Sequence, residues 1–303
     1  MRNLIIALIV LVLIGGGIYY FTKDNNLDYS GQPTATTTAT TTTIAEFEVI
    51  GQSVAGREIK AYRFGTGAKT VVFVGALHGG YEWNSALLSY ELIDHLKANP
   101  AIIPSDVRVV VIPVANPDGL AKVMGTAERF AAADAPQFDF ADEVKFSDPV
   151  VAGRFNGNGV DLNRNFDCQW QAKAVWRDYQ TKAGSAAFSE PEAAALRDFL
   201  LAEKPVGVIF YHSASNGVYT SYCGQADPLP GTVKLLSAYA SASGYPRYDS
   251  YPYYEVTGDA ADWLSTKGIP AVTVELATHE STDWSKNLAG VKAVLSLYSQ
   301  AAN

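Results

Sequence analysis

Residues 74–96, VGALHGGYEWNSALLSYELIDHL, join an apolar run typical of a buried strand to the pattern of an amphipathic helix. His78 ends the strand-like run, two glycines follow, and Glu82 opens the helical pattern. In open α/β sheets, ligand sites lie at the carboxyl ends of the strands. The stretch therefore predicts a strand–turn–helix unit with His78 and Glu82 as candidate metal ligands at its turn.

Strand-like and helical patterns alternate along the rest of the chain. Strands are expected at residues 47–54, 57–65, 70–77, 107–115, 206–213 and 271–276, and helices at residues 82–97, 189–203, 231–243, 259–267 and 287–300. This order predicts an α/β fold: a single domain, residues 46–303, with a mixed, mostly parallel central sheet flanked by helices. Residues 122–158 show no clear period, and we expect them to form a long irregular loop that shapes a site.

The charge and the cysteine count limit the class of protein. The chain has 23 Lys and Arg residues against 31 Asp and Glu residues, a net charge of −8. Nucleic acid is not an expected partner, because phosphate binding needs a concentrated basic surface. Cys168 and Cys223 could form one disulfide in an oxidising compartment or remain two buried thiols, and we favour the thiols.

The first residues differ from the rest of the chain. Residues 4–21 are an uncharged apolar run, and at about 1.5 Å per residue they would form a helix of roughly 27 Å, enough to cross a bilayer core. We predict a membrane anchor at residues 1–23, a flexible Thr-rich linker at residues 24–45, and a catalytic domain outside the cytoplasm. The alternative is a cleaved signal and a secreted protein.

Two of the four histidines are candidates for metal binding. His78 and His212 each end an apolar strand-like run, whereas His95 lies in a helical pattern and His279 in a loop. A strand-end histidine often only donates to a carbonyl group, and an acid at a helix start often only complements the helix dipole. Two such histidines with Glu82 nearby nevertheless match a catalytic zinc site, which takes three protein ligands and keeps one position open.

Further motifs occur in an order that resembles one known family. They are DLNRNF at residues 161–166, HS at residues 212–213 and VEL around Glu275, together with NPDG from Asn116 and SEPE from Ser189. With His78 and Glu82, this set resembles the zinc carboxypeptidases, also called funnelins, from about Phe47 to the C-terminus. The resemblance implies one zinc ion bound by His78, Glu82 and His212, and a peptide substrate with a free terminal carboxylate.

The resemblance also implies roles for six other residues. Asp161 would accept the second ring N–H of His78, and Asn163 and Arg164 would bind the terminal carboxylate. Arg154 would stabilise the oxyanion of the scissile carbonyl, and Tyr254 would cap the substrate. Glu275 would be the general base, since a carboxylate within the apolar run AVTVEL is costly without a function.

Two features depart from the family pattern or leave the substrate open. Three residues separate His78 from Glu82 where the family has two, so we expect a local bulge at Gly79 and Gly80. Ala261 is small and neutral, which slightly favours an apolar or aromatic C-terminal side chain. Cleavage of cell-wall peptides at a γ-D-glutamyl-diaminopimelate bond is the alternative, and a deacylase or a non-catalytic binding module are remoter ones.

Overall fold

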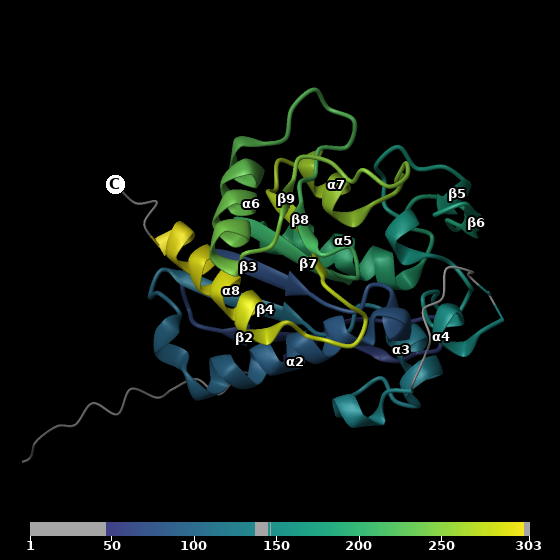
Figure 1. Ribbon diagram of the computed structural model, residues 1–303, viewed down its shortest axis with the longest axis horizontal. Helices are drawn as coiled ribbons and strands as arrows, with labels where there is room; N and C mark the ends of the chain where they lie inside the picture. The colour runs from purple at the N-terminus through teal and green to yellow at the C-terminus, as the bar shows by residue number, and fades with distance from the viewer. Residues whose placement is uncertain (1–46, 137–144, 146, 300–303) are drawn as a thin grey trace, which may run out of the picture. The chain divides into compact units, whose positions relative to one another are not determined.

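The computed structural model describes residues 47–136, 145 and 147–299, which fall within one compact unit (Figure 1). Its centre is an eight-stranded sheet with the strand order β1-β2-β4-β3-β7-β10-β8-β9. The strands are β1 (Phe47–Gln52), β2 (Glu58–Phe64), β3 (Lys69–Val74), β4 (Val107–Ile112), β7 (Gly207–Ser213), β8 (Gly217–Tyr219), β9 (Arg247–Tyr248) and β10 (Ala271–Leu276).

The sheet is parallel in its middle and mixed towards its edges. Strands β4, β3, β7 and β10 pair in parallel, whereas β1 pairs with β2, β2 with β4, and β8 with β10 in antiparallel orientation. The predicted mixed α/β sheet is therefore confirmed. The central strands are buried almost throughout, as expected for parallel strands that are covered on both faces.

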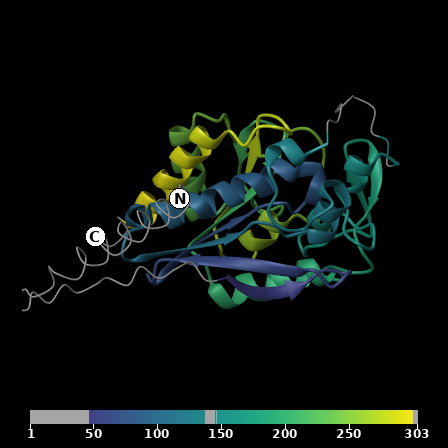
Figure 2. The same cartoon turned by 90° about the horizontal axis from the view of Figure 1, so that it is seen from below.

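Helices cover both faces of the sheet (Figure 2). On one face lie α2 (Trp83–Ala98), α6 (Pro230–Ser243) and α8 (Trp284–Ser299), which pack on alternate residues of the central strands such as Val71 and Phe73. On the other lie α5 (Pro191–Glu203) and α7 (Ala260–Ser265), which pack on Val72 and Val74. This alternation follows from the two-residue period of a strand.

Several short elements had no counterpart among the predicted ones. Helix α3 (Pro117–Met124) begins within NPDG, and α4 (Pro149–Ala152) lies near the end of the predicted loop. A separate hairpin consists of β5 (Lys173–Trp176) and β6 (Tyr179–Lys182). The prediction of one irregular loop over residues 122–158 was thus partly wrong, because that segment starts inside α3 and contains α4.

The two cysteines form a disulfide, so the preference for free thiols was wrong. Cys168 and Cys223 are bridged with a Cα–Cα distance of 5.6 Å across a separation of 55 residues. The sequence spacing could not reveal this contact, because it depends on how two long loops fold over the same layer. The bridge joins the loop after Arg164 to the loop after β8.

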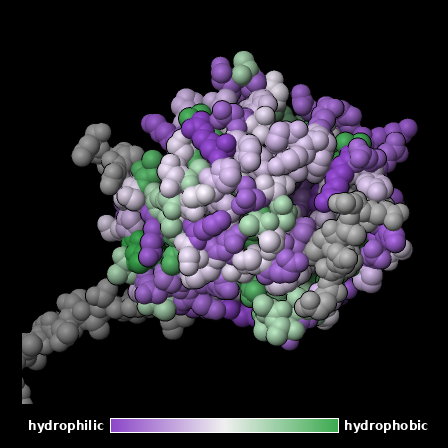
Figure 3. Space-filling view, in the orientation of Figure 1, coloured by the Kyte–Doolittle hydropathy of each residue, from purple (hydrophilic) through white to green (hydrophobic). Residues whose placement is uncertain are grey.

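The predicted membrane anchor, residues 1–23, and the linker, residues 24–45, lie outside the described residues. Within the described part of the chain, no helix is both long enough and apolar enough to cross a membrane. On the face of the molecule shown in Figure 3, hydrophobic residues form small separate areas among hydrophilic ones.

Candidate active site

The three predicted metal ligands lie together at the carboxyl ends of neighbouring strands. His78 Nδ1 lies 2.7 Å from Glu82 Oε1, His212 Nδ1 lies 2.9 Å from Glu82 Oε2, and the two Nδ1 atoms are 3.0 Å apart. All three residues are buried, and one ligand atom from each lies within 4.8 Å of the others. Such a cluster could hold one metal ion.

A 3-10 turn between β3 and α2 brings Glu82 to this cluster. The turn spans Gly79–Glu82, and Gly79 has a φ of +49°, a conformation that favours glycine. A side chain at Gly79 would meet the carbonyl oxygen of Gly153 at 2.5 Å. The extra residue between His78 and Glu82 is therefore accommodated by a turn that has no room for a side chain at position 79. Glu82 reaches the cluster from the N-cap of α2.

The charges in the cluster stabilise one another. Burial alone would raise the pKa of Glu82, but the imidazoles of His78 and His212 hold it well below its usual range. Burial likewise opposes the charged form of Asp161, and Arg154 together with His78 keeps the pKa of Asp161 low. Both carboxylates are thus charged at neutral pH, as metal ligation and its support require.

Asp161 and Arg154 lie beside the ligands. Asp161 Oδ1 is 3.3 Å from His78 Nε2, and its Oδ2 accepts a 2.9 Å hydrogen bond from Arg154 Nε. The Arg154 guanidinium is 3.8 Å from Glu82 Oε1 and packs on the Trp176 ring at 4.4 Å. Arg154 therefore reaches the ligand cluster, as its predicted role requires.

Glu275 is placed by the sheet register. It pairs with His212 in the neighbouring parallel strand, and its Oε2 accepts a hydrogen bond from Ser215 N at 3.2 Å. Burial, and secondly the charge of Glu82, raise the pKa of Glu275 to about 7. A carboxylate with this pKa can both take up and release a proton near neutral pH.

Asn163 and Arg164 form the next part of the site, which we call the clamp. Arg164 is only 2% exposed, and its guanidinium donates to the carbonyl oxygens of Val175 and Asn163. Among the described residues it makes no ion pair with a carboxylate. Asn163 Nδ2 donates to Asp259 Oδ2 at 2.7 Å, and its Oδ1 accepts from Ala260 N. The clamp thus presents a buried positive charge that forms no ion pair within the described part of the chain.

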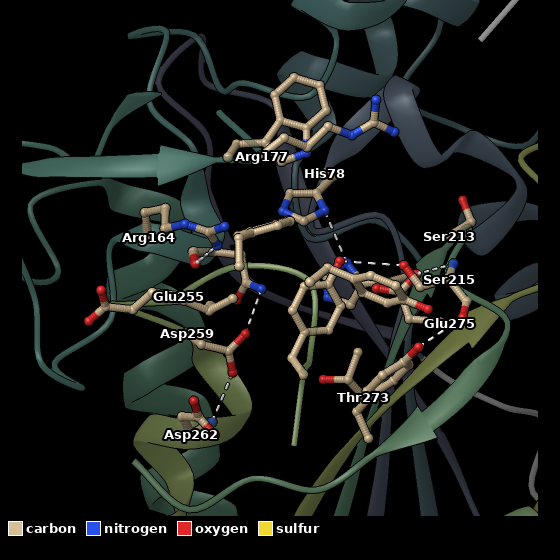
Figure 4. Close-up of a pocket in the computed structure, with 18 of the residues that line it drawn as sticks. His78, Arg164, Arg177, Ser213, Ser215, Glu255, Asp259, Asp262, Thr273 and Glu275 are labelled. Carbon is tan, nitrogen blue, oxygen red and sulfur yellow. Dashed lines mark hydrogen bonds between the residues drawn. The ribbon is translucent and has the colours of Figure 1, made fainter. Parts of the chain in front are cut away.

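One cavity of about 870 Å³ connects all these groups. His78, Glu275 and Arg164 line it together with Arg177 and the acids Asp259 and Asp262 (Figure 4). Tyr254 lines it too, as do its neighbours Tyr251 and Tyr253, and the Arg164 guanidinium lies 5.9 Å from the Tyr254 ring. Every site residue predicted from the sequence lines this cavity except Asp161, which lies behind His78.

The structure corrects the expectation of a neutral pocket around Ala261. Ala261 belongs to α7, is 2% exposed and packs in the core instead of lining the cavity. Asp259 and Asp262 line the cavity and form what we call the acidic wall. Asp259 caps α7 by accepting from Asp262 N, and Asp262 accepts from Tyr222 N. Burial, and then the nearby Asp259, raise the pKa of Asp262 to about 7.

Several lining residues were not found as site residues from the sequence, and three of them lie on the side of the cavity near Arg154. Trp176 and Arg177 belong to the β5–β6 hairpin, which had no recognisable pattern. His279 was expected to make only a polar contact, and it does contact Ser213 Oγ at 3.0 Å, but it also lines the cavity. Burial lowers the pKa of His279 to about 4, so it is neutral at pH 7.

Known proteins share both the sequence pattern and the fold. A family model described as zinc carboxypeptidase matches residues 34–301. The chain belongs to the zinc carboxypeptidase family. The fold is similar to that of carboxypeptidase A from Helicoverpa armigera, with a TM-score of 0.63 and 20% identity over 86% of this chain and 69% of that one. It is also similar to murein-tripeptide amidase MpaA from Escherichia coli O157, with a TM-score of 0.58 and 21% identity over 83% and 91%.

Curated relatives include enzymes named for cell-wall peptides. This zinc carboxypeptidase homologue is 26% identical to gamma-D-glutamyl-L-diamino acid endopeptidase 1 of Lysinibacillus sphaericus over 76% of the chain and 60% of that protein. It is 28% identical to murein peptide amidase A of Escherichia coli K12 over 44% of the chain and 55% of that protein. The chain thus spans somewhat more than half the length of these relatives.

The residues present fit the zinc ion that this family uses. Two imidazole nitrogens and a carboxylate are the donor types that catalytic zinc takes, and they converge without a fourth protein ligand in the cluster. The acid behind His78 is the support that a zinc-bound histidine typically has. His78, Glu82 and His212 would therefore hold the ion.

Proposed function

We propose that this protein is a zinc-dependent carboxypeptidase that hydrolyses the last peptide bond of a substrate with a free terminal carboxylate. The observation that carries this proposal is the buried guanidinium of Arg164, which faces the cavity and makes no ion pair with any described carboxylate. An unpaired buried charge is costly, and a guanidinium matches a carboxylate through two parallel hydrogen bonds. A substrate carboxylate would supply the missing negative charge.

The surrounding residues then have defined tasks. When bound, zinc supplies Lewis-acid polarisation of a carbonyl group and of a water molecule. The Glu275 carboxylate takes a proton from the attacking water and passes it to the nitrogen of the leaving amino acid. Arg154 donates to the oxygen of the scissile carbonyl as negative charge develops there. Tyr254, over the Arg164 guanidinium, closes the cavity on the bound terminal residue.

Cleavage of a γ-D-glutamyl-diamino acid bond is the second candidate, and the acidic wall favours it. Asp259 is hydrogen-bonded to Asn163, so the wall lies next to the clamp where the C-terminal residue binds. Neither Asp259 nor Asp262 has a Lys or Arg partner in the described part of the chain. A diamino acid carries a second ammonium group that would interact with these acids, and one of the relatives is named for such a substrate.

The test compares peptides that differ only at the C-terminus. The zinc-loaded protein is expected to cleave an N-acyl dipeptide with a free carboxylate at least about a hundredfold faster, in kcat/KM, than its C-terminal amide. Arg164→Gln should remove most of this preference, and Glu275→Gln should abolish turnover while zinc remains bound. Equal cleavage of acid and amide would contradict the proposal. Faster cleavage of L-Ala-γ-D-Glu-L-Lys than of the acyl dipeptide would favour the second candidate.

We also propose that the catalytic domain works outside the cytoplasm, held by an anchor at residues 1–23 or secreted after its removal. The Cys168–Cys223 disulfide supports this location, because disulfides persist mainly in oxidising compartments. Fractionation of cells followed by detection of the intact N-terminus would separate the anchored form from the secreted one.

A further inference from the structure

Arg177 occupies the tip of the β5–β6 hairpin, at the edge of the cavity. Trp176 pairs with Tyr179, so Arg177 and Asp178 are the two turn residues. Arg177 has a φ of +53°, which is uncommon for a residue with a long side chain. The Arg164 Nε–Val175 O bond fixes the hairpin against the clamp. The position of Arg177 relative to the site is therefore set by backbone contacts.

The charge of Arg177 is not neutralised by any acid that the structure describes. Among the described residues its guanidinium makes no ion pair, not even with the adjacent Asp178, and its one recorded contact is with the Trp176 ring at 5.8 Å. Its positive charge nevertheless acts on the site: burial is the main cause that lowers the pKa of His279, and the charge of Arg177 lowers it further. Arg177 is thus a free cation that faces the catalytic cavity.

Arg177 lies towards the scissile carbonyl and away from the acidic wall. The guanidinium of Arg154, which we expect at the scissile carbonyl, lies 4.4 Å from the Trp176 ring, and that of Arg177 lies 5.8 Å from the same ring, so both cations contact one indole. In Figure 4, Arg177 lies near the top of the view next to His78, and Asp262 lies near the bottom. The acidic wall joins the clamp, where the leaving residue binds, which leaves Arg177 for the acyl side of the scissile bond.

We infer that Arg177 recognises a second carboxylate on the residue that supplies the scissile carbonyl, and that it selects glutamyl substrates. This inference rests on the proposed peptidase function. In a γ-linked glutamyl residue, the free α-carboxylate lies a short methylene chain from the scissile carbonyl, which matches a second cation that shares the Trp176 ring with Arg154. A guanidinium binds such a carboxylate by charge-assisted hydrogen bonds. Arg177 is a specificity residue and takes no part in bond cleavage.

The experiment removes this carboxylate without changing the shape of the substrate. The full-length, zinc-loaded protein is assayed on L-Ala-γ-D-Glu-L-Lys and on the matching peptide with γ-D-isoglutamine, in which the α-carboxylate is a neutral amide. The wild type should prefer the carboxylate form by about five- to tenfold in kcat/KM, as expected for a partly exposed charge pair, and added salt should reduce this preference. An α-linked L-glutamyl peptide shows whether the linkage itself also matters.

Variants decide whether Arg177 is responsible. Arg177→Ala should lower kcat/KM for the carboxylate form to that of the amide form and leave the amide form unchanged, while Arg177→Lys retains part of the preference. Arg197→Ala is the matched control, because Arg197 pairs with Asp198 on α5 and does not line the cavity. Equal loss on both substrates, or no preference in the wild type, would overturn the inference.

The outcomes also separate this inference from the proposed function. If the acyl dipeptide and the γ-D-isoglutamine peptide are cleaved but Arg177→Ala does not change the preference for the carboxylate form, the peptidase function stands and the role of Arg177 is refuted. If no peptide with a free terminal carboxylate is cleaved, the proposed function itself fails.

Discussion

Asp262 links the acidic wall to a measurable pH dependence. Its pKa of about 7 means that it is neutral below pH 7 and charged above it. The side-chain ammonium of lysine, with a pKa near 10.4, stays charged across this range. Peptides ending in lysine should therefore gain affinity as the pH rises through 7.

The prediction is best tested as a ratio. We expect kcat/KM for a lysine-terminated peptide, divided by that for the isosteric norleucine peptide, to rise several-fold between pH 6 and pH 8. The titration of Glu275 changes kcat/KM for both peptides in the same way, so its effect cancels in the ratio. Asp262→Asn should flatten the ratio, and a ratio that is constant with pH in the wild type would exclude an ionic role for the acidic wall.

At the scale of single residues, the sequence predicted the metal-binding and catalytic residues better than the residues that we propose to select the substrate. His78, Glu82, His212 and Glu275 follow or interrupt apolar strands, so local pattern alone marks them, and the structure brings all four to one cavity. Asp259 and Arg177 neither follow nor interrupt an apolar strand, so no local sequence pattern distinguishes them. Their position depends on a loop before α7 and on a hairpin whose short strands have no clear alternation.

At the scale of elements, the turn between β3 and α2 decides the metal site. Gly79→Ala would place a Cβ atom 2.5 Å from Gly153 O and 2.7 Å from the backbone of Gly119. The turn would have to move, and Glu82 with it. We expect the affinity for zinc to fall about 10- to 100-fold, measured by competition with a chromogenic chelator.

Gly125→Ala provides the matched control for this substitution. Gly125 also has a positive φ, of +71°, but a Cβ there meets nothing within 4 Å. The Gly125→Ala substitution should lower the free energy of unfolding by about 1 kcal/mol and leave the affinity for zinc unchanged. Equal zinc affinity in the two variants would show that the turn does not position Glu82.

The long elements were predictable, whereas the short ones were not. The six strands and five helices with clear periods were all found near the expected bounds. Strands β8 and β9 have three and two residues, too few to show a period, and they form because β8 pairs with the edge of β10 and β9 pairs with β8. Their absence from the prediction reflects tertiary pairing and not local preference.

At the scale of the whole molecule, the disulfide should contribute to stability. It closes a loop of 55 residues, for which loop entropy predicts about 4 kcal/mol, and measured values for disulfides are typically 2–4 kcal/mol. Reductant should therefore shift the urea unfolding midpoint of the wild type downwards. The double variant Cys168→Ala, Cys223→Ala should be less stable by a similar amount and insensitive to reductant. An unchanged midpoint in the reduced wild type would show that no bridge is present.

The register between β7 and β10 has a consequence for how such an enzyme can change. His212 and Glu275 are held by neighbouring parallel strands, and a slip of one residue would turn Glu275 towards the opposite layer. The residues that we propose to contact the substrate's distinguishing groups instead come from the β5–β6 hairpin and from the start of α7. Insertions or exchanges in those two segments could therefore create new preferences while the reaction itself is conserved by the sheet.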